Sequence, residues 1–179
     1  AAQIAVVAAG GLCQKNPNGR EMGVARKISL TTEGRAHSMY DGKASVFDAF
    51  ISHNDEITHV PAGSQILSGN SFTRIQSVSV SFRNGLFWGL QYHPEYNLYE
   101  MARLIWCRRK KLVDLGFFSD MRAGENYIKI LEALHKDPNR ADLSWRLGMD
   151  SDILDENVRC VEAKNWLEKL VFVKMLQPR

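Results

Sequence analysis

The stretch "FWGLQYHPEY", residues 87–96, decides the fold, because its apolar strand ends abruptly in a histidine, a proline and a glutamate. Just before it, residues 77–82 alternate between serine and large apolar side chains, as a half-exposed strand does. The Arg-Asn-Gly sequence at 83–85 supplies a turn between the two segments. Together they predict a β-hairpin between residues 76 and 92, whose first strand is half exposed and whose second is buried on both faces.

The end of this hairpin carries two side chains suited to proton transfer. In an extended chain residues i and i+2 point the same way, so His93 and Glu95 project to one side, and Pro94 stiffens the backbone between them. A carboxylate beside an imidazole fixes its tautomer and stabilises its cation, as a general base serving a thiol or hydroxyl nucleophile requires. In the alternative interpretation, His93 caps the strand and Glu95 is solvated, and a bare His-x-Glu spacing more often has that meaning.

The composition of the chain changes near Tyr96. Before it, the apolar run at 3–11 predicts a buried helix that ends at Gly-Gly. Short strands are predicted over residues 24–30, 46–52 and 65–69. Sequences such as "TEGR" at 32–35 predict turns between them. After Tyr96, helical periodicity predicts helices over residues 98–115, 124–136 and 156–175. The chain is therefore interpreted as an α/β domain at 1–97 followed by a helical extension at 98–179.

Composition excludes several classes of function. The chain has 179 residues, of which 45% are hydrophobic and 24% charged, as in an ordinary globular domain. A net charge of +3 gives no electrostatic reason to expect a nucleic-acid or membrane partner. The basic run at 103–112 fits a helix with a solvated cationic face better than a nucleic-acid patch. The apolar stretch Ile4–Cys13 is too short to span a bilayer, and we identify no targeting segment.

The cysteines and histidines predict neither a disulfide framework nor a metal site. The three cysteines lack CxxC spacing and a nearby histidine pair, which favours a reducing, cytoplasmic location. Three further histidines, His37, His59 and His135, are scattered without the spacing of metal ligands. No cofactor is expected.

Several segments together resemble the class I (triad) glutamine amidotransferases. In that family a G-x-C-x-G-x-Q elbow leads into an apolar helix ending in Gly-Gly, a Ser-His-x-Asp segment follows, and a strand delivers His-Pro-Glu. This chain has "AAQIAVVAAGG" at 1–11, "ISHNDE" at 51–56 and "GLQYHPE" at 89–95. Its segment 16–31 is similar to the amidotransferase domain of GMP synthase. The resemblance covers residues 1 to about 105 and implies a flavodoxin-like three-layer α/β domain, of which this chain is the C-terminal part.

The resemblance also implies roles for single residues. His93 is the expected general base and Glu95 the residue that orients it. Gln3, Ser52 and His53 are the expected glutamine-binding residues, Ser52 and His53 largely through backbone groups. In such enzymes a cysteine thiolate attacks the glutamine side-chain amide, ammonia leaves for an acceptor synthase domain or subunit, and water hydrolyses the glutamyl thioester.

The nucleophile of this family has no counterpart within the chain. Counted back from Gln3, the elbow glycine falls on Ala1 and the cysteine two positions before residue 1, so the chain alone is expected to be inactive. Cys13 follows the Gly-Gly helix end and lacks the strand-to-helix elbow that lowers a thiol pKa, so we expect a small, semi-buried hydrophobic side chain there.

Three functional hypotheses remain. The first is a glutaminase-type domain that supplies ammonia, and the second is a γ-glutamyl hydrolase or peptidase of the same superfamily. The third is a non-catalytic module that kept the fold and lost the chemistry. The apolar stripe of the helix predicted at 156–175 either packs on the domain or forms a homodimer.

Overall fold

The computed structural model describes residues 1–175, and the chain divides into two compact units. Unit 1 consists of Ala1–Glu95 together with Asn157–Arg179, and unit 2 consists of Tyr96–Glu156. The last helical segment, which the sequence analysis grouped with the extension, therefore lies in the same unit as the strands. The final four residues of the predicted extension, 176–179, lie outside the described residues.

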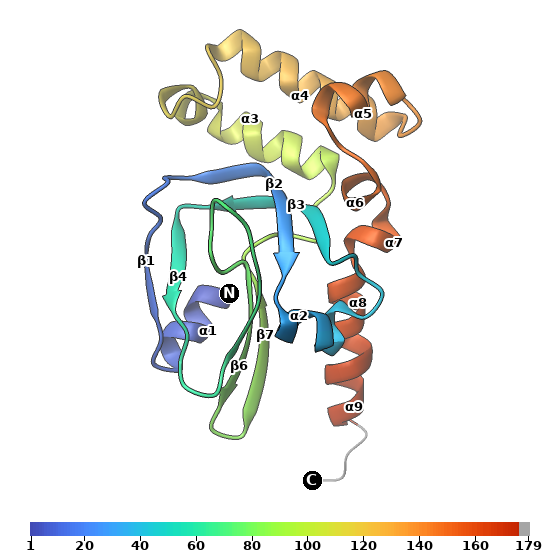
Figure 1. Ribbon diagram of the computed structural model, residues 1–179. Coiled ribbons are helices and arrows are strands. Elements are labelled where there is room, and N and C mark those ends of the chain that lie inside the picture. Colours follow the sequence, from blue (N-terminus) through green and yellow to red (C-terminus); the bar gives the residue numbers. More distant parts are fainter. Residues whose placement is uncertain (176–179) are drawn as a thin grey trace. The chain divides into compact units, whose positions relative to one another are not determined.

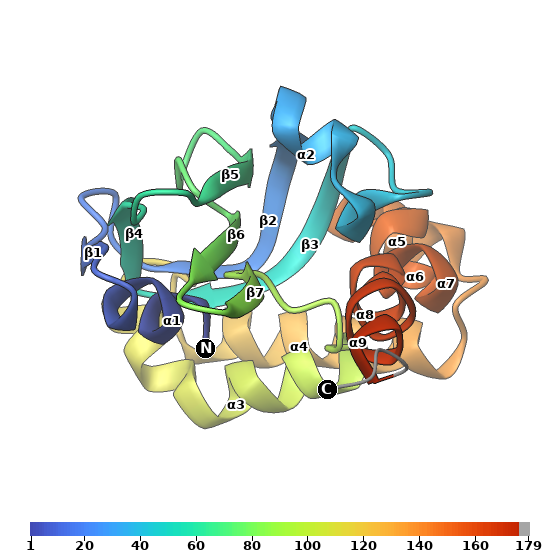
Figure 2. The same ribbon diagram turned by 90° about the horizontal axis from the view of Figure 1, so that it is seen from below.

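Unit 1 is built on a five-stranded antiparallel sheet that curls around its core (Figures 1 and 2). Its order is β3-β2-β5-β6-β7. These strands are β3 (Val46–His53), β2 (Glu21–Leu30), β5 (Gln65–Gly69), β6 (Ser77–Phe82) and β7 (Gly85–Leu90). The predicted strands at 24–30, 46–52 and 65–69 are confirmed as β2, β3 and β5. A two-stranded ribbon of β1 (Leu12–Lys15) and β4 (Asp55–His59) was not predicted, because neither segment alternates cleanly between apolar and polar residues.

The predicted hairpin is confirmed, with β6 and β7 paired from Ser77–Leu90 to Phe82–Gly85. The predicted burial of the two strands is wrong. The first four residues of β6 are buried, whereas β7 is mostly exposed or half buried. The reason is position in the sheet: β6 lies between two strands, and β7 is an edge strand of the described sheet.

The helix predicted at 3–11 is α1 (Ala2–Ala8), which buries Ala2 and Val6 against β6 and β7. The prediction that the helix is buried is wrong, because only one side of α1 contacts the strands and Ile4 and Val7 are exposed. Figure 2 shows α1 beside these strands. A side chain at Gly89 of β7 would place its Cβ 2.9 Å from that of Ala2, so glycine is needed for this close approach. Gly10 follows the helix with a φ of 96°, as the Gly-Gly signal indicates.

The turn predicted at 32–35 is instead a short helix, α2 (Thr32–Ala36), followed by a 3₁₀ turn, η1 (Ser38–Tyr40). The hydroxyl of Thr31 accepts a hydrogen bond from the Gly34 amide at 2.9 Å and so caps the helix. Gly34 lies against the Leu67 carbonyl, where a Cβ would come within 1.9 Å, so tertiary contact fixes the helix. A sequence pattern of five residues does not reveal that contact.

Among the described residues of unit 1, buried apolar side chains gather in two groups within the core. The first lies between β2, β3 and the α2–η1 segment, and the second under α1 and β6. The first comprises Ala25, Ile28, Leu30, Met39, Tyr40, Phe47, Ala49, Ile51, Leu67 and Tyr92. The second comprises Ala2, Val6, Ile57, Ile75, Val78 and Val80.

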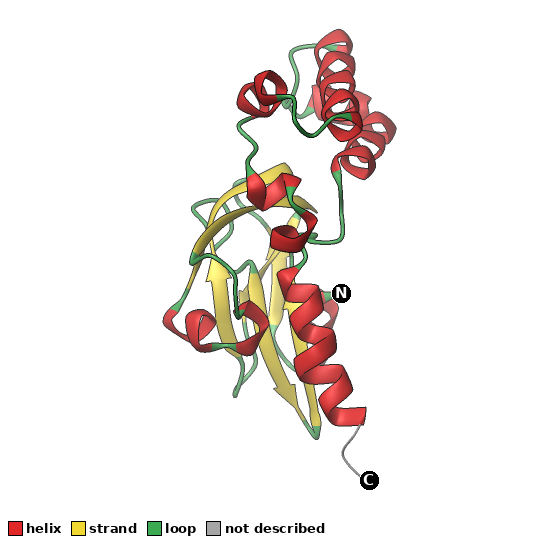
Figure 3. Ribbon diagram, turned by 90° about the vertical axis from the view of Figure 1, so that its right-hand side faces the viewer, coloured by secondary structure: helices red, strands yellow, loops and turns green. Residues whose placement is uncertain are grey.

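The C-terminal helical segment runs beside the strands of unit 1 (Figure 3). The single helix predicted over 156–175 is interrupted. It consists of α7 (Glu156–Arg159), α8 (Val161–Trp166), a π-helical turn η2 (Leu167–Val171) and α9 (Phe172–Met175). Cys160 lies between α7 and α8 with non-helical dihedral angles of −94° and 12°. α8 packs against η1, so this segment closes one side of the first core group.

Unit 2 is helical. It contains α3 (Leu98–Asp114), α4 (Met121–Lys136), α5 (Ala141–Leu147) and α6 (Ser151–Leu154). The predicted helices at 98–115 and 124–136 are confirmed as α3 and α4, which pack against each other. α3 begins with a capping box between Asn97 and Glu100 and buries Met101, Ile105 and Leu112. Among the described residues, no helix is long and apolar enough to cross a membrane.

Candidate active site

The chain after β7 places His93 beside the end of β3. Tyr92 forms an antiparallel bridge with Ile51, and the His93 amide donates a hydrogen bond to the Phe50 carbonyl at 2.7 Å. Tyr92 is 2% exposed and points into the first core group. Because successive side chains of an extended chain alternate, His93 projects away from that core.

The histidine and glutamate predicted from the sequence are in contact. Nδ1 of His93 lies 2.8 Å from Oε1 of Glu95, and the two side chains are 29% and 61% exposed. Partial burial alone would raise the Glu95 pKa, but the hydrogen bond with His93 outweighs it and holds that pKa below its ordinary 4.5. Glu95 is therefore ionised at neutral pH and accepts the bond, so the proton lies on Nδ1 and the lone pair of the neutral ring on Nε2. That is the tautomer of a general base.

Gln3 connects α1 to the strand that leads to His93. Its Nε2 donates to the Asp55 carbonyl at 2.6 Å and to Oε1 of Gln91 at 2.8 Å. Gln91 is buried and donates in turn to the Ile75 carbonyl at 2.7 Å. Gln91 lies two residues before His93 in the "QYHPE" segment. It was not predicted as a site residue, because a glutamine within an apolar strand carries no chemical signature of its own.

Ser52 and His53 end β3, directly after the residue that bridges Tyr92. The Ser52 hydroxyl accepts a hydrogen bond from Nη2 of Arg20 at 3.2 Å. Nε2 of His53 lies 3.3 Å from a carboxylate oxygen of Glu21, close enough for an ion pair, although its geometry is not that of a hydrogen bond. The residues just before them in β3 contact the strand of His93, through the Phe50 carbonyl and the Ile51 bridge.

Glu21 is the centre of a buried polar cluster under the end of β3. Its carboxylate accepts hydrogen bonds from Asn70 at 2.8 Å, Thr73 at 2.7 Å and Gln76 at 2.9 Å. Burial alone would raise the pKa of Glu21, but the nearby His53 imidazole and these donors outweigh it and lower the pKa below 4.5. Glu21 was not predicted as a site residue, because its only signal in the sequence is a carboxylate at the start of a strand.

This lowered pKa predicts an acid-sensitive contribution to stability. The unfolded chain binds a proton at Glu21 more readily than the folded one, so the contribution is complete above about pH 4.5 and is lost as the pH falls below it. We expect Glu21→Gln to flatten the fall in the free energy of unfolding of unit 1 across this window, measured by denaturant titration at several pH values. An acid limb of unchanged steepness would contradict the assignment.

Cys13 has the properties of a structural cysteine rather than a nucleophile. Its Sγ donates a weak hydrogen bond to the Gln3 carbonyl at 3.7 Å. Burial, followed by the charge of Asp55, raises the pKa of the Cys13 thiol above its ordinary 9.0. A thiol that serves as nucleophile at neutral pH needs the opposite shift.

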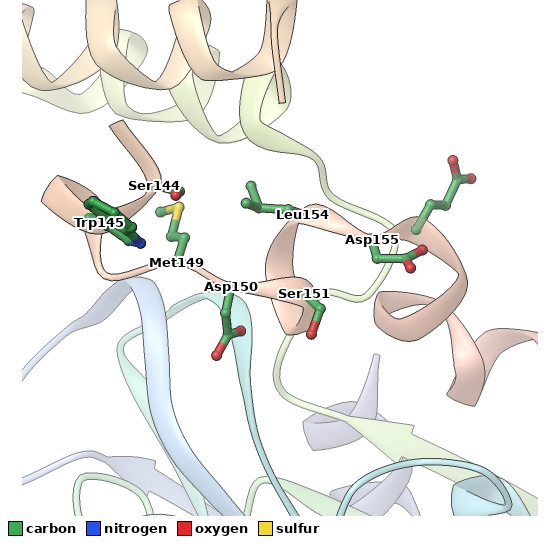
Figure 4. Close-up of a pocket in the computed structure, with 8 residues that line it drawn as sticks. Ser144, Trp145, Met149, Asp150, Ser151, Leu154 and Asp155 are labelled. Carbon is green, nitrogen blue, oxygen red and sulfur yellow. The ribbon is translucent and has the colours of Figure 1, made fainter. Parts of the chain in front are cut away.

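Unit 2 has a surface hollow of about 610 Å³, away from the predicted site residues in the sequence (Figure 4). Ser144, Trp145, Met149, Asp150, Ser151, Leu154, Asp155 and Glu156 line it. Figure 4 shows Trp145 and Met149 close together at one end and Asp155 at the other. The lining offers neither a histidine nor a cysteine. Within residues 1–175, no group of three or more histidine, cysteine or acidic side chains could hold a metal ion.

Comparison with known proteins identifies the family. The model of the family described as "Glutamine amidotransferase class-I" matches residues 1–106, more than half of the chain. The chain therefore belongs to the class-I glutamine amidotransferases, and the resemblance inferred from the sequence is confirmed.

Two curated relatives are matched over different lengths. The gamma-glutamyl-L-1-hydroxyisopropylamide hydrolase of a Pseudomonas species is 30% identical over 174 residues, which is 94% of this chain and 58% of that protein. A glutamine-hydrolyzing GMP synthase subunit of Ignicoccus hospitalis is 34% identical over 64 residues, 36% of this chain and 33% of that protein. The chain thus spans between a third and three fifths of these relatives.

Two solved structures confirm the predicted α/β fold class. A glutamine amidotransferase from Thermotoga maritima superposes with a TM-score of 0.54 at 19% identity, covering 74% of this chain and 55% of that one. A glutamine amido transferase from Methylobacillus flagellatus gives 0.56 at 16% identity, covering 99% and 61%. At such identities the likeness concerns the fold alone.

Proposed function

We propose that the protein to which this chain belongs hydrolyses the side-chain amide of glutamine, with His93 as general base and Glu95 as the residue that orients it. The observation that carries the proposal is the 2.8 Å contact between Nδ1 and a carboxylate oxygen, at the end of a strand, in a class-I glutamine amidotransferase. Gln3, Ser52 and His53 are proposed to bind the substrate.

The proposed reaction needs a cysteine four positions before Gln3. Nε2 of His93 takes the thiol proton, the thiolate attacks the amide carbon, and backbone N–H groups stabilise the oxyanion. The imidazolium then gives its proton to the leaving nitrogen, and ammonia departs. Water, deprotonated by His93, hydrolyses the glutamyl thioester to glutamate, which restores the thiol. Glu95 stabilises the imidazolium in both halves of the cycle.

A second candidate is hydrolysis of a γ-glutamyl amide other than glutamine. It is favoured by the relative that matches 94% of this chain, helical segments included, and whose name states such a substrate. The chemistry is the same, except that an amine departs in place of ammonia. The second candidate requires a site that binds an alkyl group on the scissile nitrogen, whereas glutamine carries only hydrogen there.

The two candidates are separated by substrate preference in the full-length protein. Glutamate release is measured with glutamine and with γ-glutamyl-isopropylamide, each without an acceptor. A higher kcat/KM for glutamine supports the first candidate, and a higher value for the alkylamide supports the second. If a protein shown to be folded turns over neither substrate, the third hypothesis, a non-catalytic module, is supported.

We expect Glu95→Gln to lower kcat by less than about 100-fold, a smaller effect than removal of the base itself. The carboxylate is 61% exposed, so water replaces part of its electrostatic effect, and the amide still orients the ring. Initial rates of glutamate release measure this effect. A loss as large as that of the His93→Ala variant would indicate a different division of roles.

Under the first candidate, the further partner is an ammonia-accepting synthase domain or subunit. The match to a GMP synthase subunit supports this proposal. A cytoplasmic location and a homodimer are also proposed, the latter because large apolar side chains of α9, such as Phe172 at 51%, are exposed.

A further inference from the structure

The C-terminal segment holds the chain on both sides of His93. After it, the Pro94 carbonyl accepts hydrogen bonds from Nε of Arg159 at 3.3 Å and from Sγ of Cys160 at 3.1 Å. Before it, the Tyr92 hydroxyl donates to Oε1 of Glu162 at 2.7 Å. All these residues belong to unit 1. The His93 amide bonds to β3, and the residues on either side of it bond to the C-terminal segment.

Besides its hydrogen bond with Tyr92, the carboxylate of Glu162 forms a buried ion pair with Lys43. Its second oxygen pairs with Nζ of Lys43 at 3.1 Å, and the two side chains are 0% and 2% exposed. Lys43 also donates to the Val158 carbonyl at 2.8 Å and lies over the ring of Phe47 at 4.7 Å. A buried, fully paired charge has one favourable position. The Glu162 carboxylate therefore holds the Tyr92 hydroxyl in place.

The Tyr92 hydroxyl is also connected to the sheet. It lies 2.8 Å from the Tyr40 hydroxyl, which in turn donates to Oγ of Ser77 at 2.6 Å. Tyr92 is therefore held by buried polar contacts between the C-terminal segment and β6. A displacement of Glu162 moves the Tyr92 hydroxyl that bonds to it, and Tyr92 directly precedes His93.

We propose that Arg159, Cys160 and Glu162, here named the brace, are positioning residues for His93 through Tyr92 and Pro94. The inference rests on the function proposed above and adds to it residues that lie outside the segment matched by the family model, which ends at residue 106. The brace fixes the direction of the imidazole toward the reacting atoms. A displacement of about 1 Å in such a group costs on the order of 100-fold in rate.

The test compares variants of the full-length protein in glutamate release. Glu162→Gln keeps the shape of the side chain but puts an amide group against Lys43, and Tyr92→Phe removes only the hydroxyl. We expect each to lower kcat about 10- to 100-fold while KM stays within about two-fold. Because both act through one contact, the double variant is expected to lose little more than either single variant.

Asn165→Ala is the matched control. Asn165 lies on the same helix and donates to the carbonyls of Met39 at 3.0 Å and Asp41 at 2.9 Å, without touching the strand end. We expect it to lower the melting temperature and to leave kcat unchanged. If Glu162→Gln and Tyr92→Phe likewise lower only the melting temperature, the brace is structural and the inference is overturned.

Failure of the proposed function gives a different pattern. In that case the wild-type protein releases no glutamate, or His93→Ala retains wild-type turnover. Activity in the wild type, its loss in His93→Ala and its full retention in Glu162→Gln and Tyr92→Phe would overturn the brace alone.

Discussion

Replacing His93 by alanine in the full-length protein is expected to lower kcat for glutamate release by about 10²- to 10⁴-fold, the usual contribution of a general base. Nδ1 of the imidazole contacts Glu95, and Nε2 is the nitrogen proposed to take the thiol proton. Without it, neither the thiol nor the hydrolytic water has an acceptor for its proton. Substrate binding is expected to change little, so the loss falls on kcat rather than on KM.

Stability is expected to stay within about 1 kcal/mol of the wild type in this variant, because the substitution creates no cavity in the core. The His93 side chain projects away from the core and is 29% exposed. His59→Ala is the control, since His59 is an exposed histidine of the same unit that contacts Thr58 at 3.2 Å. Wild-type turnover in His93→Ala, or equal loss in His59→Ala, would contradict the assignment of the base.

Replacing Lys43 by methionine is expected to cost about 3–5 kcal/mol of stability in unit 1, because it leaves the buried Glu162 carboxylate unpaired. Burial already raises the pKa of Glu162 above its ordinary 4.5, against the opposing effect of Lys43. In the variant that pKa rises further. Since the folded protein then binds a proton that the unfolded chain releases, stability falls as the pH rises above 4.5, and the loss is larger near pH 8 than near pH 6.

Hydrogen exchange of slowly exchanging amides in β2 and β3 gives the free energy of unfolding for this test, because it reports on unit 1 within the full-length protein. The double variant Lys43→Met with Glu162→Gln is the control, since it removes both charges and is expected to recover most of the loss. A Lys43→Met variant as stable as the wild type at pH 8 would show that the pair is not a buried charge pair in solution.

The elements that the sequence predicted correctly are those with a strong local signal. β5 at 65–69 and the hairpin around residues 83–85 follow from alternation and turn residues, and α3 follows from apolar periodicity. α2 was missed because its position depends on the contact of Gly34 with Leu67, more than thirty residues away. The prediction made β6 half exposed and β7 buried, the reverse of the structure, because the order of strands in a sheet depends on contacts between distant parts of the chain.

The candidate site divides in the same way. His93 and Glu95 could be paired from sequence, because the i, i+2 geometry of an extended chain brings them together. Lys43 and Glu162 could not be paired from sequence, since they are separated by 119 residues and each has the sequence pattern of an ordinary surface charge. Only the packing of α8 against η1 makes them a buried pair.

The central claim is that His93 activates a cysteine four positions before Gln3 for attack on a γ-glutamyl amide. The most direct measurement is mass spectrometry of the full-length protein, quenched in acid during turnover and digested. The account predicts a γ-glutamyl thioester on that cysteine in the wild type and its absence in His93→Ala. A serine, glycine or alanine at that position, or an adduct that forms equally in both proteins, would contradict it.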